Sequence, residues 1–415
     1  MGEMIHTGRY HISTTDKFKD IILSVRLMGE NREPDVTMRN LIAQILIDRC
    51  ALYPSKGKMT EKCDELYGAT VDTKTSSYGN GHCFELRAKT LNNRYAPDEP
   101  FDGLLQFVRE LFLYPLIDEK TLSEAKTNVL ASILRQEDNP SHLSMMKACE
   151  LGGSGTPLAV SSQGNKKFID SVNIDELSAY YKKMLNDDQF DIFCVGDVHP
   201  DRVLNQFRKT FDFLNETNVT QTAYVSELSP YQEGQTVKQI EQTSLTQLYA
   251  TQTGFGHPRF SSNRLAIVML GQLPSSLMFQ EIREKRSLCY SIYASTIAFD
   301  GIMFVSTGIS PENTDEVKRL IKVQIDTLKS GEFEDDLLKM AKDMMISSLK
   351  SLSDEAPAEI NFFYQRLLAG KSPTMETVLN EINQVTREQI IEAVNYWQPI
   401  CSYAVTKEQQ HGNHQ

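Results

Sequence analysis

Histidine spacing decides whether this chain could hold a zinc ion as helical hydrolytic sites do. Such a site needs two histidines at positions i and i+4, so that both imidazoles project from one helix face, together with a carboxylate as base. No two of the eight histidines stand four residues apart; they are His6, His11, His82, His142, His199, His257, His411 and His414. The sequence therefore predicts no metal site of this kind.

The cysteines offer no alternative chemistry. There are seven of them, widely scattered and without a C-x-x-C pair, which indicates reduced and mainly structural thiols. A zinc site built from His82, Cys83, Cys50 and Cys63 would match no common ligand spacing, and adjacent strand residues point to opposite faces. Cys194 lies in an apolar run and is interpreted as a core residue rather than a nucleophile.

A stretch in the second half combines an arginine with a tyrosine. Residues 275–291 run from a helix preceded by Pro274 into a strand, with Arg283 on the helix and Tyr290 in the strand. By their pattern alone, Arg283 is a solvated cation on a helix face and Tyr290 a half-buried strand residue. The spacing by itself assigns them no function.

Apolar periodicity predicts the elements that would position these residues. In the first half it indicates strands at 18–26, 70–76, 83–88 and 191–195 and helices at 37–46, 60–67, 104–114 and 119–136. In the second half it indicates strands at 244–254 and 288–295, helical residues at 264–280 interrupted at Pro274, and helices at 314–329 and 334–351.

The two halves carry an internal repeat. A shift of 216 residues places Ala125-Lys126 on Ala341-Lys342 and Asp138 on Asp354, and it also superposes the apolar positions of the two helices. Strands followed by a helix pair, twice, predict two α+β domains, each a mostly antiparallel sheet with helices packed on one face. We expect an N-terminal domain at 1–214, a linker at 215–236, a C-terminal domain at 237–405 and a polar tail at 406–415.

Composition excludes several classes of function. The chain has 415 residues and a net charge of −12, which argues against nucleic-acid binding and allows basic peptide partners. No stretch approaches the roughly 18 apolar residues that a membrane span needs. The N-terminus carries neither a signal peptide nor a myristoylation signal, so we expect a cytoplasmic protein.

Residues 275–291 closely resemble the C-terminal-domain signature of the pitrilysin/insulinase-type zinc peptidases, in particular the processing-peptidase-like branch. Glu65-Leu66-Tyr67-Gly68-Ala69, Gly254-Phe255 and the helix pair ending near Asp354 extend the resemblance over nearly the whole chain. It is nearest to small bacterial two-domain members, including a type named for an association with modification of elongation factor P. The resemblance implies the LuxS/processing-peptidase-like metallopeptidase fold in both domains.

The same resemblance implies that this chain has lost the catalytic motif. The family's catalytic motif is an inverted His-x-x-Glu-His, which counting back from Gly68-Ala69 places at Leu46-Ile47-Asp48-Arg49-Cys50. A further glutamate completes the zinc ligands, and counting back from Asp138-Asn139-Pro140 places it near Ser132. All of these positions differ from the motif. We therefore expect a chain that is not an enzyme by itself and needs no cofactor, with zinc only in a partner subunit.

The resemblance also implies that this chain has kept the two residues with which the family holds its substrate. The family's C-terminal domains use an arginine and a tyrosine at the spacing of Arg283 and Tyr290 to hold a peptide near the zinc. This implies a non-catalytic subunit that forms a heterodimer with a His-x-x-Glu-His-bearing homologue and processes peptides with it. The alternatives are a structural or scaffolding homologue without a role in proteolysis, with elongation factor P modification as a conceivable context, and an autonomous zinc peptidase with an unrecognised ligand set.

Overall fold

The computed structural model describes residues 4–217, 230–371 and 374–407. The chain divides into two compact units, neither of which is continuous in sequence. Among the described residues, unit 1 contains 4–133, 161–217 and 352–364, and unit 2 contains 134–160, 230–351, 365–371 and 374–407. No helix of the described residues is both long and apolar enough to cross a membrane.

Unit 1 is built on a six-stranded sheet. Its strands, in the order β1-β2-β6-β3-β5-β4, are β1 (Met4–Thr7), β2 (Tyr10–Thr14), β6 (Gln189–Gly196), β3 (Asp20–Glu30), β5 (Gly81–Leu91) and β4 (Thr70–Tyr78). All neighbours are antiparallel except β2 and β6. The helices that begin in this unit are α1 (Glu33–Asp48), α2 (Lys56–Glu65), α3 (Pro100–Leu113), α4 (Glu119–Asp138), α6 (Lys166–Ser171), α7 (Ile174–Asp187), α8 (Pro200–Thr210) and α12 (Ala356–Leu368).

Alternation along β3 separates the two faces of this sheet. Leu23, Val25 and Leu27 belong to the hydrophobic core that the sheet forms with α1 and α3. Ser24 and Arg26 lie between them in sequence and therefore point to the opposite face. One face of the sheet is thus apolar and covered by helices, and the other carries buried polar groups.

Unit 2 is built on a five-stranded sheet in the order β7-β11-β8-β10-β9. The strands are β7 (Gln232–Val237), β11 (Gln398–Thr406), β8 (Thr243–Ala250), β10 (Ile302–Ile309) and β9 (Cys289–Ile297), and only β7 and β11 run parallel. The helices that begin in unit 2 are α5 (Pro140–Gly152), α9 (Phe260–Gly271), α10 (Thr314–Ser330), α11 (Asp335–Leu352), α13 (Met375–Gln384) and α14 (Arg387–Asn395).

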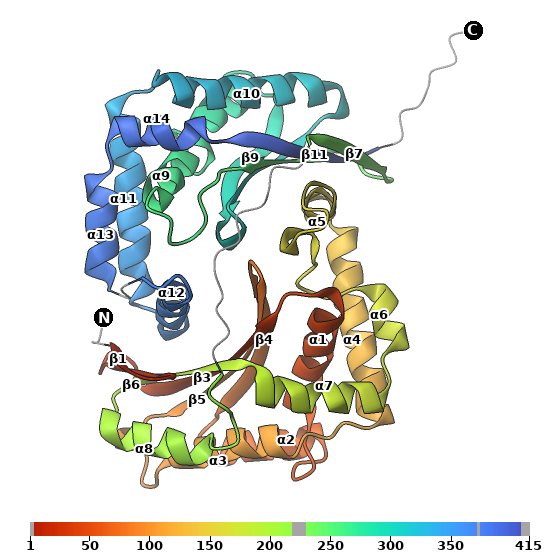
Figure 1. Cartoon of the computed structure of the whole chain (residues 1–415), viewed down its shortest axis with the longest axis vertical. Coiled ribbons are helices and arrows are strands. Elements are labelled where there is room, and N and C mark those ends of the chain that lie inside the picture. Colours follow the sequence, from red (N-terminus) through yellow and green to blue (C-terminus); the bar gives the residue numbers. More distant parts are fainter. Residues whose placement is uncertain (1–3, 218–229, 372–373, 408–415) are drawn as a thin grey trace. The chain divides into compact units, whose positions relative to one another are not determined.

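The helices reproduce the repeat found in the sequence, and one helix of each half belongs to the compact unit formed mainly by the other half. The shift of 216 carries the first residue of α4 onto that of α11, and that of α5 onto that of α12. Helix α5 packs on β8 and β11 of unit 2, whereas α12 up to Tyr364 belongs to unit 1. In Figure 1, α5 accordingly has the yellow of the first half and α12 the blue of the second. Each half of the sequence therefore supplies a helix to the other compact unit.

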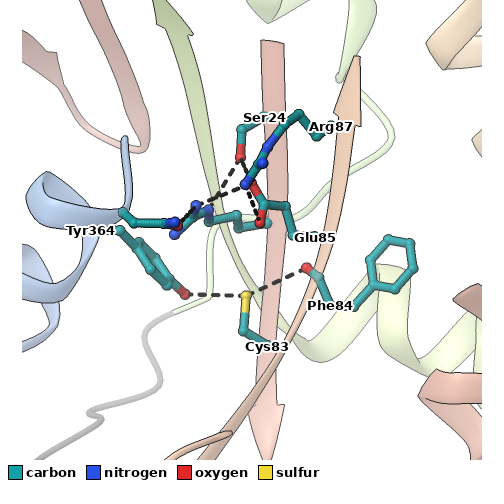
Figure 2. A network of polar contacts seen from close by, with 8 residues as sticks. Ser24, Cys83, Phe84, Glu85, Arg87 and Tyr364 are labelled. Carbon is teal, nitrogen blue, oxygen red and sulfur yellow. Dashed lines mark hydrogen bonds and ion pairs between the residues drawn. The ribbon is translucent and has the colours of Figure 1, made fainter. Parts of the chain in front are cut away.

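The two exchanged helices dock by different chemistry. Helix α5 contributes Ala148 to an apolar cluster with Leu248, Ala250 and Cys401 of the unit 2 sheet. Helix α12 instead places Tyr364 among the polar side chains of the unit 1 sheet, where its hydroxyl donates to the sulfur of Cys83 at 3.7 Å (Figure 2). Each sheet thus carries one helix on the face opposite its main helical layer.

The predicted α+β fold with two mostly antiparallel sheets is confirmed, but two boundaries differ. Residues 232–236 of the predicted linker belong to strand β7, because their backbone pairs with β11. The contiguous domain ranges also differ from the compact units, because the exchanged helices follow spatial packing rather than chain order. Most of the predicted linker, 218–229, and most of the predicted tail, 408–415, lie outside the described residues.

Candidate functional site

The positions that correspond to the zinc motif are part of the core of unit 1. Leu46 near the end of α1 is 1% exposed and Cys50 just beyond it is 0% exposed, and both pack in the main hydrophobic cluster. Arg49 donates hydrogen bonds of 2.5 Å to Asp48 and to Glu124 of α4. Because α1 ends at Asp48, Leu46 and Cys50 do not share one helical face. Ser132 lies half-buried on α4.

Within the part of the chain that the structure describes, no group of three or more His, Cys, Asp or Glu side chains is arranged to hold a metal ion. The imidazole of His82, considered with Cys83 in the sequence, is fully buried. Its burial, together with the charge of Arg39, lowers its pKa to about 3. This histidine is therefore neutral at physiological pH.

The cysteines are reduced, as their spacing in the sequence predicts. All seven cysteines are free. Burial raises the pKa of Cys83 and of Cys149 to about 12, and it raises the pKa of the fully buried Cys194 as well. Because a thiolate is the nucleophilic form, these raised pKa values make the three thiols inert at neutral pH.

Arg283 and Tyr290 line the same pocket of unit 2. The pocket has a volume of about 410 Å³, and its walls are formed by Arg283, Glu284, Ser287, Leu288, Cys289, Tyr290, Ser310 and Asn313. The two residues proposed from the sequence are thus brought together. The neighbouring Ser310 and Asn313, from the loop after β10, were not predicted, because nothing in their local sequence links them to residues 275–291.

Arg283 is positioned by a π-helix, residues Phe279–Glu284. The wider turn shows in the hydrogen bond from the Lys285 amide to the Gln280 carbonyl, at 3.0 Å. The guanidinium carbon of Arg283 lies 4.6 Å from the centre of the Phe279 ring, a cation–π contact. Among the described residues, Arg283 forms no ion pair with a carboxylate, and its side chain is exposed. Its N–H donors are therefore available to a ligand.

Tyr290 is positioned by a β-bulge. Ser291 is opposite Gly308 and Cys289 is opposite Ile309, so Tyr290 is the extra residue on β9. A bulge redirects a side chain and increases the local twist. The tyrosine is 60% exposed, whereas Cys289 before it and Ile292 two residues after it are buried. Ser287, just before the strand, has a left-handed backbone with φ of 51°. The exposure of Tyr290 is greater than its sequence context predicts.

Strand β9 also offers backbone groups. It is the last strand of its sheet, and among the described strands it pairs with β10 alone, so the N–H and C=O groups along its outer side have no partner in another described strand. Arg283, the tyrosine hydroxyl and this free strand edge together form a set of hydrogen-bond donors and acceptors around one concave surface. Such a set suits an extended polypeptide.

Comparison with known proteins assigns the family. A family model described as the peptidase M16 inactive domain matches residues 171–345. The chain is 24% identical over 391 residues to the probable inactive metalloprotease YmfF of Bacillus subtilis, and the alignment covers 92% of each chain. The chain is a homologue of the M16 peptidases. These are the pitrilysin/insulinase-type peptidases that the sequence resembles, and the resemblance is confirmed.

The fold of this M16 homologue also occurs in solved structures. A conserved protein from Enterococcus faecalis matches with a TM-score of 0.88 at 24% identity, over 97% of this chain and 96% of that one. A peptidase M16 inactive domain from Pseudomonas fluorescens matches with a TM-score of 0.81 at 17% identity, over 98% of each chain. The descriptions of the family model and of the Bacillus relative agree with the expectation that the chain is not a peptidase by itself.

Proposed function

We propose that this M16 homologue is a non-catalytic, substrate-holding subunit that binds extended peptides and pairs with a zinc-bearing homologue, which cleaves them. The observation that carries the proposal is that Arg283 and Tyr290 line one pocket at the free edge of a sheet. They do so in a chain whose sequence lacks the His-x-x-Glu-His motif.

The chemistry of the pocket supports a peptide ligand. The arginine offers several N–H donors in a fixed planar fork, which suits peptide carbonyls, and its contact with Phe279 limits the freedom that binding would have to remove. The tyrosine hydroxyl can donate to a carbonyl oxygen that gains negative charge during hydrolysis in the partner's site. A peptide strand added to β9 would gain main-chain hydrogen bonds without strict sequence preference.

The zinc-motif positions support a division of labour between two chains. Leu46 and Cys50 contribute apolar contacts to the core, and Arg49 is engaged with Asp48 and Glu124. These residues stabilise the fold instead of presenting ligands. Hydrolysis of a bound peptide therefore needs a metal supplied by another polypeptide.

Peptide binding can be measured on the chain alone. Fluorescence anisotropy of a labelled, unstructured basic peptide of about 15 residues reports the affinity, the peptide being basic because the chain is acidic. We expect Arg283→Ala and Tyr290→Phe each to weaken binding by roughly three- to tenfold. The matched controls are Arg286→Ala and Tyr293→Phe, which change exposed residues of the same segment that do not line the pocket.

The partnership is tested by coexpression with a His-x-x-Glu-His-bearing homologue from the same organism. We expect a stable complex whose peptide cleavage falls on Arg283→Ala and not on Arg286→Ala. A stable complex with unchanged cleavage in both variants would contradict the holding role and favour a scaffolding protein. Failure of the two chains to associate would contradict the partnership.

A further inference from the structure

Strand β1 lies at the edge of the unit 1 sheet and has little apolar anchorage. It pairs with β2 along Met4–Thr7 and, among the described strands, with no other. Figure 1 shows it in red at one end of that sheet. None of its four residues belongs to the hydrophobic core of unit 1, and Ile5 is 42% exposed. Apolar burial therefore contributes little to holding β1 on the sheet, so its polar contacts carry more weight.

The main side-chain contact of β1 joins two imidazoles. His6 stands directly opposite His11 of β2 in the strand register, and the two Nδ1 atoms lie 2.8 Å apart. Two ring nitrogens at this distance share a hydrogen bond, in which one carries the hydrogen and the other accepts it. The contact therefore needs a nitrogen without a hydrogen on one of the two rings.

His11 is held from its other side by a buried carboxylate. The imidazole is 3% exposed, and its Nε2 lies 2.9 Å from Oδ1 of Asp191 in β6, which is 4% exposed. A carboxylate only accepts, so Nε2 carries a hydrogen and Nδ1 is left to face His6. The ring also stacks on Phe193, with the ring centres 4.5 Å apart. These contacts hold His11 facing His6 whatever the charge of the pair.

The number of protons on the two rings decides whether their contact survives. With both rings neutral, His6 donates to Nδ1 of His11, and with one added proton His11 donates to His6. With two added protons both Nδ1 atoms carry hydrogens, so the hydrogen bond is lost and two cations face each other. Burial and then the charge of His11 lower the pKa of His6, which agrees with a resistance to the second proton.

The charged groups around the pair do not remove this repulsion. Asp191 can balance the charge of His11, but it is shared with Arg9, whose Nη1 lies 3.7 Å from it, and Arg26 of β3 stands opposite it in the register. The other titratable groups that face this part of the sheet are Tyr364 and Glu359 of α12, the latter accepting from Ser13 of β2, and Glu216 near the turn at Gly8. Among the described residues, no carboxylate forms an ion pair with His6.

We propose that β1 is an acid-released strand, which stays on β2 while the two imidazoles share a hydrogen bond and separates when both are protonated. The paired state has its full stability above the ordinary histidine pKa of about 6.5 and loses it as the pH falls, because the open strand binds the second proton more readily. Release uncovers the outer backbone edge of β2. The inference does not rest on the proposed function of the Arg283 pocket.

Hydrogen–deuterium exchange of the full-length chain, followed by mass spectrometry, tests the release. Protection of the β1 amides, corrected for the intrinsic exchange rate at each pH, is compared at pH 7.5 and pH 5. Strand β4 at the other edge of the same sheet is the internal reference. One extra proton bound on opening raises the open fraction by at most about tenfold per pH unit below 6.5, so we expect the protection of β1 to fall by roughly three- to thirtyfold. Equal changes in β1 and β4 would overturn the proposal.

Substitutions assign the effect to the imidazole pair. His6→Gln keeps a hydrogen-bonding side chain that does not titrate, so the protection of β1 should then change with pH no more than that of β4. His6 is exposed, and the substitution leaves the core intact. The matched control is His142→Gln, which removes an exposed histidine at the start of α5 and should behave as the wild type. A wild-type pH dependence in His6→Gln, or its loss in His142→Gln, would refute the assignment.

Discussion

The guanidinium carbon of Arg26 lies 4.4 Å from the centre of the Tyr364 ring. Arg26 stands in β3 near the start of the chain, and Tyr364 in α12 near its end. The same guanidinium lies 3.0 Å from Glu85 and donates to Asn361 of α12, and Figure 2 shows Glu85 with Ser24 and Arg87 around it. This buried polar network attaches a helix of the second half to the sheet of the first.

Removing the central cation of this network should destabilise the protein strongly. Arg26 is 1% exposed, and Arg26→Met would leave Glu85 with Arg87 as its one remaining cation. We expect a loss of about 3 kcal/mol, as for other buried ion pairs that lose one partner. Arg87→Met is the matched control, because Arg87 is 28% exposed, and should cost about 1 kcal/mol or less. Urea unfolding measures both, and equal losses would contradict a central role for Arg26.

The exchange of α5 and α12 predicts how separated halves of the chain behave. Coexpressed fragments 1–221 and 222–415 should copurify, because each carries a helix that belongs to the compact unit of the other. The fragment 1–221 alone lacks α12 and leaves the polar face around Arg26 uncovered, so it should aggregate. Size-exclusion chromatography distinguishes the outcomes. A monomeric, cooperatively unfolding 1–221 fragment would show that α12 is dispensable.

Restoring the family's motif residues should not restore a zinc site. The triple variant Leu46→His, Arg49→Glu and Cys50→His places imidazoles at two core positions and removes the ion pair with Glu124. We expect substoichiometric zinc by metal analysis and a stability loss of at least about 3 kcal/mol from the buried polar groups. Leu52→His serves as control, because Leu52 is 50% exposed and should tolerate the change. One tightly bound zinc per chain in the triple variant would contradict this expectation.

Asp300 should make stability depend on pH. Burial raises the pKa of this carboxyl from 3.8 to about 7. Between these values the folded chain keeps a proton that the unfolded chain has released, so stability falls as the pH rises from about 4 to 7, by at most about 1.4 kcal/mol per pH unit. Asp300→Asn should flatten this fall, whereas Asp343→Asn, at an exposed position of α11, should not. Thermal unfolding at pH 5 and pH 8 measures the slope, and parallel slopes for wild type and Asp300→Asn would count against the raised pKa.

The local sequence was sufficient to predict the bounds of several helices and strands. The paired strands β4 and β5 and the helices α10 and α11 lie within a few residues of their predicted ranges. For the two helices the reason is that one face of each is buried, so that the helical period of the apolar residues is visible. The local sequence was not sufficient to predict strand β7 or the position of helix α12. Strand β7 is polar and forms only because β11 pairs with it, and no local period shows that Tyr364 would meet Arg26.

The sequence by itself determined the duplication, the family and the absence of the histidine pair, since these depend on residue types and spacing along the chain. The tertiary structure alone decided the exchange of α5 and α12, the π-helix that carries Arg283 and the bulge that exposes Tyr290. The physical reason is that strand register, bulges and buried ion pairs arise from contacts between segments far apart in the chain, which no local pattern encodes.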